Sequence, residues 1–202
     1  MSSVERVVAA VRAGELVVIP TDTVYGLACT PYREEPVRLL SELKGRSSEQ
    51  PIALVAAGVD RLLDCVPELR GRGAALARAL LPGPFTLVLP NPARRFPWLT
   101  GSRPDTIGVR MPALSGIEAD LFEALGVVAA TSANLHGGPD PRSLADVPAE
   151  ILDAVAAVLD AGELPGAPST VVDLTGKTPQ VIREGAVPAR VALARVHDVL
   201  GE

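Results

Sequence analysis

The chain has 202 residues, 48% hydrophobic and 3% aromatic, with 19 Lys and Arg against 24 Asp and Glu for a net charge of −5. This content suffices for one compact domain, which we expect to span residues 1–202. Acidic charge and few aromatic side chains argue against a broad nucleic-acid surface, which would neutralise phosphates and stack bases. The two cysteines form no CxxC motif, so we expect neither a disulfide scaffold nor a zinc site.

The N-terminal segment predicts a helix rather than a leader peptide. Ser2 and Glu5 have capping-box spacing before an apolar pattern that carries charge, and Gly14 can end the helix that we expect over residues 2–12. No apolar run approaches membrane-spanning length. We therefore expect a cytoplasmic protein with no membrane association.

The apolar run ELVVI, residues 15–19, predicts a buried strand that ends at the polar stretch PTDTVYGLA, residues 20–28. Helical spacing of apolar residues then predicts a helix at 34–44. The following expected elements are a strand at 52–56, helices at 58–66 and 72–81, a strand at 85–90, a loop at 91–104 and a strand at 106–111.

The remaining pattern continues to alternate. Ser115 and Glu118 have capping-box spacing and predict a helix that runs to Leu125. The later expected elements are a strand at 127–131, one or two short helices at 142–155, short strands at 156–162, 169–174 and 180–184, and a helix at 191–201. Alternating helices and strands predict an α/β domain, and the consecutive late strands predict a mixed sheet.

Several familiar motifs are incomplete. DLTGKT, residues 173–178, lacks the first glycine of a phosphate-binding loop, because Val171 stands at that position, so we expect a tight turn there. No GxGxxG follows a strand, and two histidines do not assemble a triad. A hydrolase built on a nucleophile and a base is therefore disfavoured.

The segment LKGRSSEQPI places Lys44 and Arg46 two residues apart at the end of a predicted helix. If this segment is extended, both cations lie on one face and suit a polyphosphate. The alternative, which this segment alone favours, is a solvated basic helix end stabilised by the helix dipole.

Arg110 in GVRMP lies within an apolar strand, and a buried arginine requires an anionic partner. That partner is either a structural carboxylate or a ligand carboxylate. Ser132 and Asn134 follow another strand, where they face a cleft or close an Asx turn with the glycines after them. Ser169 and Arg183 lie at further strand ends. These polar strand ends predict one convergent site that binds and neutralises charge.

Taken in order, PTDTVYGLA, KGR, PGPFT, GVRMP, TSAN, PSTVVD and IREGA resemble the YrdC-like family, the threonylcarbamoyl-AMP synthases. The pieces span residues 20 to 187 within a motif-bearing core at 8–190. The ordered set is specific, whereas each piece alone is weak. The resemblance implies a single-domain α/β fold, in which a twisted mixed sheet with flanking helices surrounds a deep, positively charged cavity.

The resemblance also implies an activity. L-Threonine, bicarbonate or CO2, and ATP with Mg2+ would give L-threonylcarbamoyladenylate and diphosphate, a nucleotidyltransferase reaction. A separate transferase complex would then modify tRNA to N6-threonylcarbamoyladenosine, with at most weak direct tRNA binding by this chain. The alternatives are a non-catalytic YrdC-like protein that binds nucleotide or RNA, and the carbamoyl-adenylate domain of hydrogenase-maturation proteins. The latter normally accompanies acylphosphatase and zinc-finger parts that this sequence does not contain.

Site residues follow by resemblance, position by position. The family tetrad that is taken as catalytic corresponds to Lys44, Arg46, Ser132 and Asn134, and its completeness favours a synthase. The implied threonine-binding residues are Thr23, Arg110, Ser132 and Ser169. The implied ATP-binding residues are Lys44, Arg46, Gln50, Thr106, Asn134, Arg142 and Arg183. The sequence carries Val55 where some members have histidine and Arg142 where some have threonine, while Asp22 fits a structural or a ligand-binding role equally well.

Overall fold

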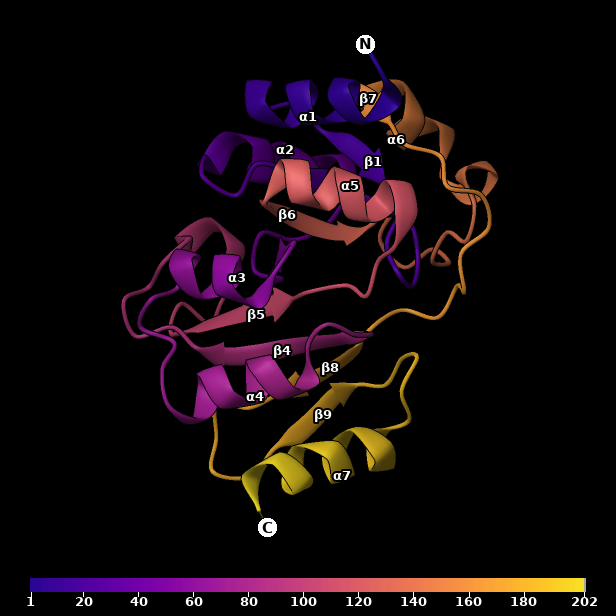
Figure 1. Ribbon diagram of the computed structural model, residues 1–202. Coiled ribbons are helices and arrows are strands. Elements are labelled where there is room, and N and C mark those ends of the chain that lie inside the picture. The colour runs from indigo at the N-terminus through magenta and orange to yellow at the C-terminus, as the bar shows by residue number, and fades with distance from the viewer. Residues whose placement is uncertain (202) are drawn as a thin grey trace.

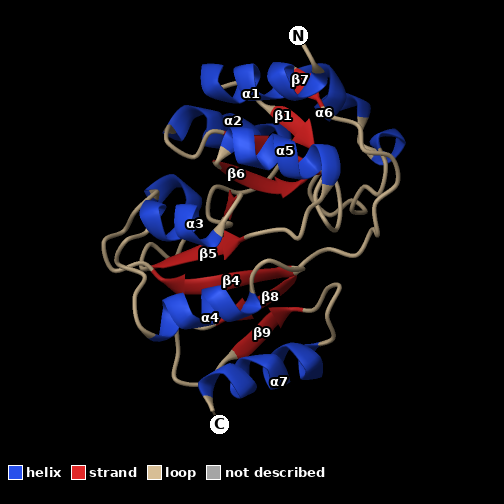
Figure 2. Ribbon diagram, viewed as in Figure 1, coloured by secondary structure: helices blue, strands red, loops and turns tan. Residues whose placement is uncertain are grey.

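The computed structural model describes residues 1–201. Its centre is one nine-stranded sheet with the strand order β7-β1-β2-β6-β3-β5-β4-β8-β9. Parallel and antiparallel pairs alternate irregularly along this order, so the sheet is mixed as predicted. Helices flank the sheet, and the two termini lie at opposite ends of the molecule (Figures 1 and 2).

Most predicted elements are present within a few residues of their expected bounds. The helices are α1 (Ser3–Ala13), α2 (Glu34–Leu43), α3 (Val59–Cys65), α4 (Arg72–Leu80), α5 (Gly116–Leu125), α6 (Ala149–Ala154) and α7 (Ala189–Leu200), with 3-10 helices η1 (Pro97–Leu99) and η2 (Leu144–Asp146). The strands are β1 (Val17–Ile19), β2 (Gly26–Cys29), β3 (Ala53–Ala56), β4 (Phe85–Pro90), β5 (Thr106–Arg110), β6 (Val127–Ser132), β7 (Ala157–Val158), β8 (Thr170–Asp173) and β9 (Gln180–Arg183).

The two predicted capping boxes have different outcomes. At α1, the Glu5 amide donates to Ser2 Oγ at 3.2 Å and the Ser2 amide donates to Glu5 Oε2 at 2.7 Å. Helix α5 also begins directly after Ser115, but Ser115 makes no side-chain capping bond. The prediction of a capping box at Ser115 was therefore wrong, although the helix start was right.

Strand β2 was not predicted, because its residues lie inside a polar motif. Thr21 Oγ1 donates to the Val24 carbonyl at 2.7 Å and turns the chain. Residues 26–29 then pair antiparallel with both β1 and β6. At the other end of the sheet, the predicted turn at 173–178 joins β8 to β9, and Asp173 accepts from the Thr175 amide.

The core has two layers, one on each face of the sheet. Alternate residues of the strands pack against α2, α3, α4 and α7 on one face. The opposite residues of β1, β3 and β6 pack against α1 and α5. These two helices cover only the half of their face that contains β1, β2 and β6, so cavity-lining residues of β4, β5 and β8 occupy the other half. In residues 1–201, no helix has the length and apolar character needed to cross a bilayer.

Candidate functional site

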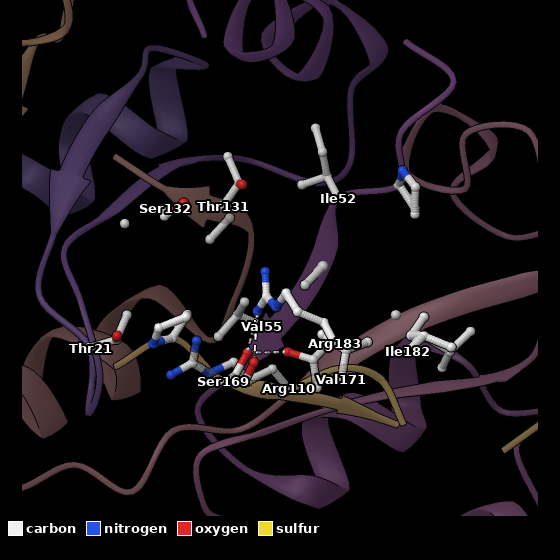
Figure 3. A pocket seen from close by; sticks show the side chains of 18 of the residues that line it. Thr21, Ile52, Val55, Arg110, Thr131, Ser132, Ser169, Val171, Ile182 and Arg183 are labelled. Atoms are coloured by element: carbon white, nitrogen blue, oxygen red, sulfur yellow. Dashed lines mark hydrogen bonds between the residues drawn. The ribbon is translucent and has the colours of Figure 1, made fainter. Parts of the chain in front are cut away.

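A cavity of about 300 Å³ lies on the sheet face that α1 and α5 leave partly uncovered. Strands β3, β4, β5, β6, β8 and β9 all contribute to it (Figure 3). Its polar lining consists of Thr21, Arg46, Thr86, Arg103, Thr106, Arg110, Thr131, Ser132, Ser169 and Arg183. Within the described chain the lining includes four arginines and no Asp or Glu, a composition that suits an anionic ligand.

The segment that carries Lys44 and Arg46 is not extended, contrary to one prediction. Gly45 adopts a left-handed conformation with φ +65°, and the Arg46 amide donates to the Ser41 carbonyl at 2.9 Å. This is the usual way in which glycine ends a helix. Both side chains nevertheless reach the end of β6, because the turn directs them to neighbouring residues of that strand.

Lys44 is buried behind the cavity wall, with 5% of its surface exposed. Its ammonium group donates to the carbonyls of Ser132 at 2.6 Å and Asn134 at 2.8 Å, and also to Asn134 Oδ1. Burial, assisted by the charge of nearby Arg46, lowers the pKa of Lys44 to about 8. Lys44 therefore holds the end of β6 in place and adds positive charge without itself lining the cavity.

Ser132 and Asn134 serve the same junction. Ser132 Oγ donates to Asn134 Oδ1 at 2.7 Å, and Asn134 Nδ2 donates to the Gly138 carbonyl at 2.6 Å. Asn134 thus closes a local turn, as one sequence alternative proposed, and binds Lys44 as well. Of the two, Ser132 lines the cavity and Asn134 does not.

Arg46 crosses from the helix end into the cavity. Its guanidinium donates to Thr131 Oγ1 at 3.1 Å and to the Pro51 carbonyl at 2.7 Å. Its Nε is buried and has no hydrogen-bond partner among the described residues. Burial and the positive charge of Arg183 lower the pKa of Arg46. A bound anion would offset both effects, because it favours the charged form of arginine.

Arg110 has a structural carboxylate as its partner. It donates to Asp22 and, at 2.6 Å, to Thr23 Oγ1, and Asp22 also accepts from the Ala113 amide at 3.0 Å. The Arg110 and Asp22 side chains are only 11% and 9% exposed. Asp22 therefore has a structural role, while the Arg110 side chain still lines the cavity and Thr23 lies behind it.

The opposite wall comes from the last two strands. Arg183 donates to the carbonyl and hydroxyl of Ser169 at 2.8 and 3.2 Å. Ser169 Oγ and Thr86 Oγ1 lie 2.8 Å apart. Burial lowers the pKa of Arg183 as well. In Figure 3, Arg110, Ser169 and Arg183 lie close together in the cavity, although they come from three different strands or strand ends.

The cavity unites most but not all of the residues implied by resemblance. Arg46, Thr106, Arg110, Ser132, Ser169 and Arg183 line it. Thr23, Lys44 and Asn134 support that lining from behind. Gln50 is outside the lining, and Arg142 pairs instead with the exposed Glu163 at 2.9 Å.

Four polar lining residues were not among the site residues named from the sequence, although the first of them lies in the polar stretch at residues 20–28: Thr21, Thr86, Arg103 and Thr131. Thr86 alternates with Val88 on an otherwise apolar strand, a signal that could have revealed it. Arg103 is one of three arginines in the loop at 91–104, and nothing in the sequence distinguishes it from Arg94 or Arg95.

The donor set does not fit a resident magnesium ion. Mg2+ prefers oxygen ligands that include carboxylates, whereas the described lining offers only hydroxyls, guanidinium groups and backbone atoms. Asp22 and Asp173 lie nearby, but each is paired with an arginine. No group of three or more His, Cys, Asp or Glu in residues 1–201 is placed to hold a metal.

Comparison with known proteins agrees with this fold. The family model Sua5/YciO/YrdC, described as "Telomere recombination", matches residues 9–185, and the chain belongs to this family. A Xanthomonas campestris protein named threonylcarbamoyl-AMP synthase is 35% identical over 181 residues, 88% of this chain and 95% of that protein.

Two solved structures extend the likeness to three dimensions. The crystal structure of Pyrococcus abyssi Sua5 complexed with L-threonine has a TM-score of 0.86 and 35% identity, and the match covers 98% of this chain but 57% of that one. Escherichia coli YciO gives a TM-score of 0.77 at 28% identity, covering 92% and 90% of the two chains. This chain therefore spans just over half of the Pyrococcus protein.

Proposed function

We propose that this chain is an L-threonylcarbamoyladenylate synthase. It would convert ATP, L-threonine and bicarbonate or CO2 into threonylcarbamoyl-AMP and diphosphate. The observation that carries the proposal is the single cavity in which Arg46, Arg110 and Arg183 converge with the hydroxyls of Ser132 and Ser169. The relatives named threonylcarbamoyl-AMP synthase favour this activity over a protein that only binds nucleotide or RNA.

In the proposed reaction, the amine of threonine adds to CO2 and loses a proton to give a carbamate. A carbamate oxygen forms a bond to the α-phosphorus of ATP, and the bond from that phosphorus to the diphosphate oxygen breaks. Such phosphoryl chemistry depends mainly on positioning and on stabilising negative charge. Mg2+ would enter with the triphosphate and share that charge, since the lining itself provides no carboxylate ligand.

Arg46 and Arg183 are assigned to the triphosphate because both line the same cavity and partial burial lowers the pKa of each guanidinium group. The positive charge of Lys44 would act on the phosphates from behind Ser132. Asn134 holds Lys44 and Ser132 in register, so its proposed contribution is to positioning. Thr106 lines the cavity and is assigned to the nucleotide.

Threonine is assigned to the wall formed by Arg110, Ser132 and Ser169. The guanidinium of Arg110 would hold the amino acid carboxylate, which would compete with or add to Asp22. Thr23 would act through its hydrogen bond to Arg110. Gln50 and Arg142 remain candidates for ATP binding that would require movement toward the cavity, because neither lines it here.

The direct test is incubation of the purified chain with ATP, L-threonine and labelled bicarbonate, followed by mass analysis of the adenylate. Label in threonylcarbamoyl-AMP, together with threonine-dependent diphosphate release, supports the proposal. Diphosphate release that does not depend on threonine would refute the proposed activity. Nucleotide binding without formation of any adenylate would also refute it and would favour a binding protein. Arg94→Ala provides a comparison variant, since Arg94 pairs with Asp105 outside the cavity lining and has no proposed role in binding.

The product would be consumed by a separate threonylcarbamoyl transferase that modifies tRNA. A carbamoyl-adenylate is a reactive mixed anhydride. In the transfer step, the N6 amine of a tRNA adenosine would form a bond to the carbamoyl carbon and lose a proton, while the bond from that carbon to the AMP oxygen breaks. Direct tRNA binding is proposed to be weak because the chain has a net charge of −5. A cytoplasmic location stays a prediction from the sequence.

A further inference from the structure

Arg103 is the cavity arginine to which no role has yet been assigned. It precedes β5, and its side chain is 49% exposed. The guanidinium donates to Asp173 Oδ2 at 2.8 Å and to Thr175 Oγ1 at 3.3 Å, both at the end of β8. It therefore links the loop before β5 to the end of β8 at the cavity, where its exposed side chain lies at the mouth.

The main chain around Arg103 is held on both sides. The Ser102 amide donates to the Glu49 carbonyl at 2.9 Å, next to the segment that carries Arg46. The Arg103 carbonyl accepts from both the amide and the hydroxyl of Thr106, at 3.0 and 3.1 Å. These bonds fix the position from which the Arg103 side chain extends over the sheet.

The sheet below Arg103 provides an apolar floor. Val88 of β4 pairs with Gly108 on one side and with Asp173 on the other, so these three residues form a row across the sheet. Gly108, Val88 and Val171 line the cavity, and glycine contributes no side chain to raise that floor. Ile182, which is 55% exposed, lies at the opposite end of the cavity from Thr21 and Ser132 (Figure 3).

Guanidinium N–H groups point along the plane of the group, so the bonds to Asp173 and Thr175 use its edge rather than its faces. The carboxylate of Asp173 also neutralises the positive charge of Arg103 before any ligand binds. An arginine held in this way can offer a flat surface to an aromatic ring. A flat cation above a floor of valine and glycine fits a planar base better than it fits a highly charged phosphate chain.

We propose that Arg103, together with Ile182 and the Val88–Gly108 floor, binds the purine base of the nucleotide at the cavity mouth. The identity of the nucleotide as ATP rests on the proposed function, whereas the division into a base end and a phosphate end rests on the geometry of the cavity. Arg46 and Arg183 would then hold the phosphates deeper in the same cavity.

The test compares calorimetric binding of ATP with binding of inorganic tripolyphosphate, which has no base. Arg103→Ala should raise the Kd for ATP by about three- to tenfold, which is the range of a partly desolvated cation–π contact. Arg103→Lys should give a similar loss, because lysine keeps the charge and can still pair with Asp173 but has no plane. The Kd for tripolyphosphate should stay within about twofold of wild type for both variants.

Arg94→Ala is the matched control. Arg94 lies in the same loop and pairs with Asp105 at 2.8 Å, but it does not line the cavity. It should leave both affinities unchanged. Ile182→Ser provides a second variant, because Ile182 also lines the cavity and has an exposed side chain, and it should also weaken ATP binding selectively. Thermal unfolding of each variant shows whether the loop itself has been disturbed.

Equal weakening of ATP and tripolyphosphate by Arg103→Ala, with rescue by lysine, would overturn the proposal in favour of a phosphate contact. Unchanged ATP affinity in both Arg103→Ala and Ile182→Ser would also overturn the proposal, and Arg103 would then only connect the loop at 91–104 to the end of β8. Wild-type protein that binds ATP without forming adenylate refutes the synthase activity and leaves the base site standing. Wild-type protein that binds no ATP refutes both.

Discussion

Removing Asp22 should destabilise the protein far more than removing a surface carboxylate. Asp22 is the charged partner of Arg110, and their side chains are 9% and 11% exposed. In Asp22→Ala, the guanidinium would keep only Thr23 Oγ1 as an acceptor from this pair of contacts. Breaking a buried ion pair in this way costs about 3–5 kcal/mol, because the remaining charge is buried without compensation.

For a chain of this size, each kcal/mol corresponds to about 2–4 °C in Tm, so the fall should be roughly 6–20 °C. Urea denaturation gives the free energy of unfolding, and a thermal scan gives Tm. Asp22→Asn should fall between Asp22→Ala and wild type, because it keeps an acceptor but no charge. Glu42→Ala is the control, since its pair with Arg38 is 57% and 53% exposed and should contribute less than about 1 kcal/mol.

The same variant probes the proposed threonine site. If Arg110 holds the carboxylate of threonine, the ligand should raise the Tm of Asp22→Ala more than that of wild type, because it supplies the missing anion. A loss below about 1 kcal/mol, similar to that of Glu42→Ala, would refute the stabilising role of Asp22. An equal shift with threonine in both proteins would refute the assignment of Arg110 to the carboxylate.

Three further predictions concern the cavity. Arg46→Ala should lower the rate of threonine-dependent diphosphate release by about 100- to 1,000-fold, and a wild-type rate would contradict its phosphate role. The pKa of Lys44 is lowered to about 8 in the free protein, and nearby phosphates should raise it, so ATP binding should be accompanied by proton uptake just above pH 8. Calorimetry in buffers of different ionisation enthalpy measures this uptake, and Lys44→Met should abolish it. Gly185→Ala should raise the KM for threonine and lower Tm, because the new Cβ would lie 2.1 Å from the Pro168 carbonyl oxygen. Gly58→Ala is the control, because a Cβ at Gly58 has no atom within 4 Å, and equal effects of the two substitutions would contradict the steric argument.

Much of the fold followed from apolar runs, but β2 did not. The residues of β3, β4 and β6 form predominantly apolar segments, which predict buried strands directly. Strand β2 is four residues long and begins at Gly26, and its pairing partners β1 and β6 lie on either side of it in the sheet. Such a strand depends on contacts distant in sequence, which local patterns do not contain.

The candidate site shows the same division. The strand-end positions of Ser132, Ser169 and Arg183 were readable, because polar residues directly adjoin apolar segments there. The partner of Arg110 was not, because Asp22 lies 88 residues away in sequence. The role of Arg103 in the cavity could not be predicted either. Its partner Asp173 reaches the loop at 91–104 only because the register between β4 and β8 sets Asp173 beside Val88.

The walls of the cavity are drawn from residues between Thr21 and Arg183, so they span most of the chain. During translation, the pocket cannot close before Arg183 has left the ribosome. Strand β1 must wait for β7, β2 for β6 and β4 for β8 before their edges are covered. Pairing across such separations makes folding slow and leaves nascent strand edges exposed to aggregation. Ligand binding in this cavity would therefore require that the chain has been synthesised as far as Arg183.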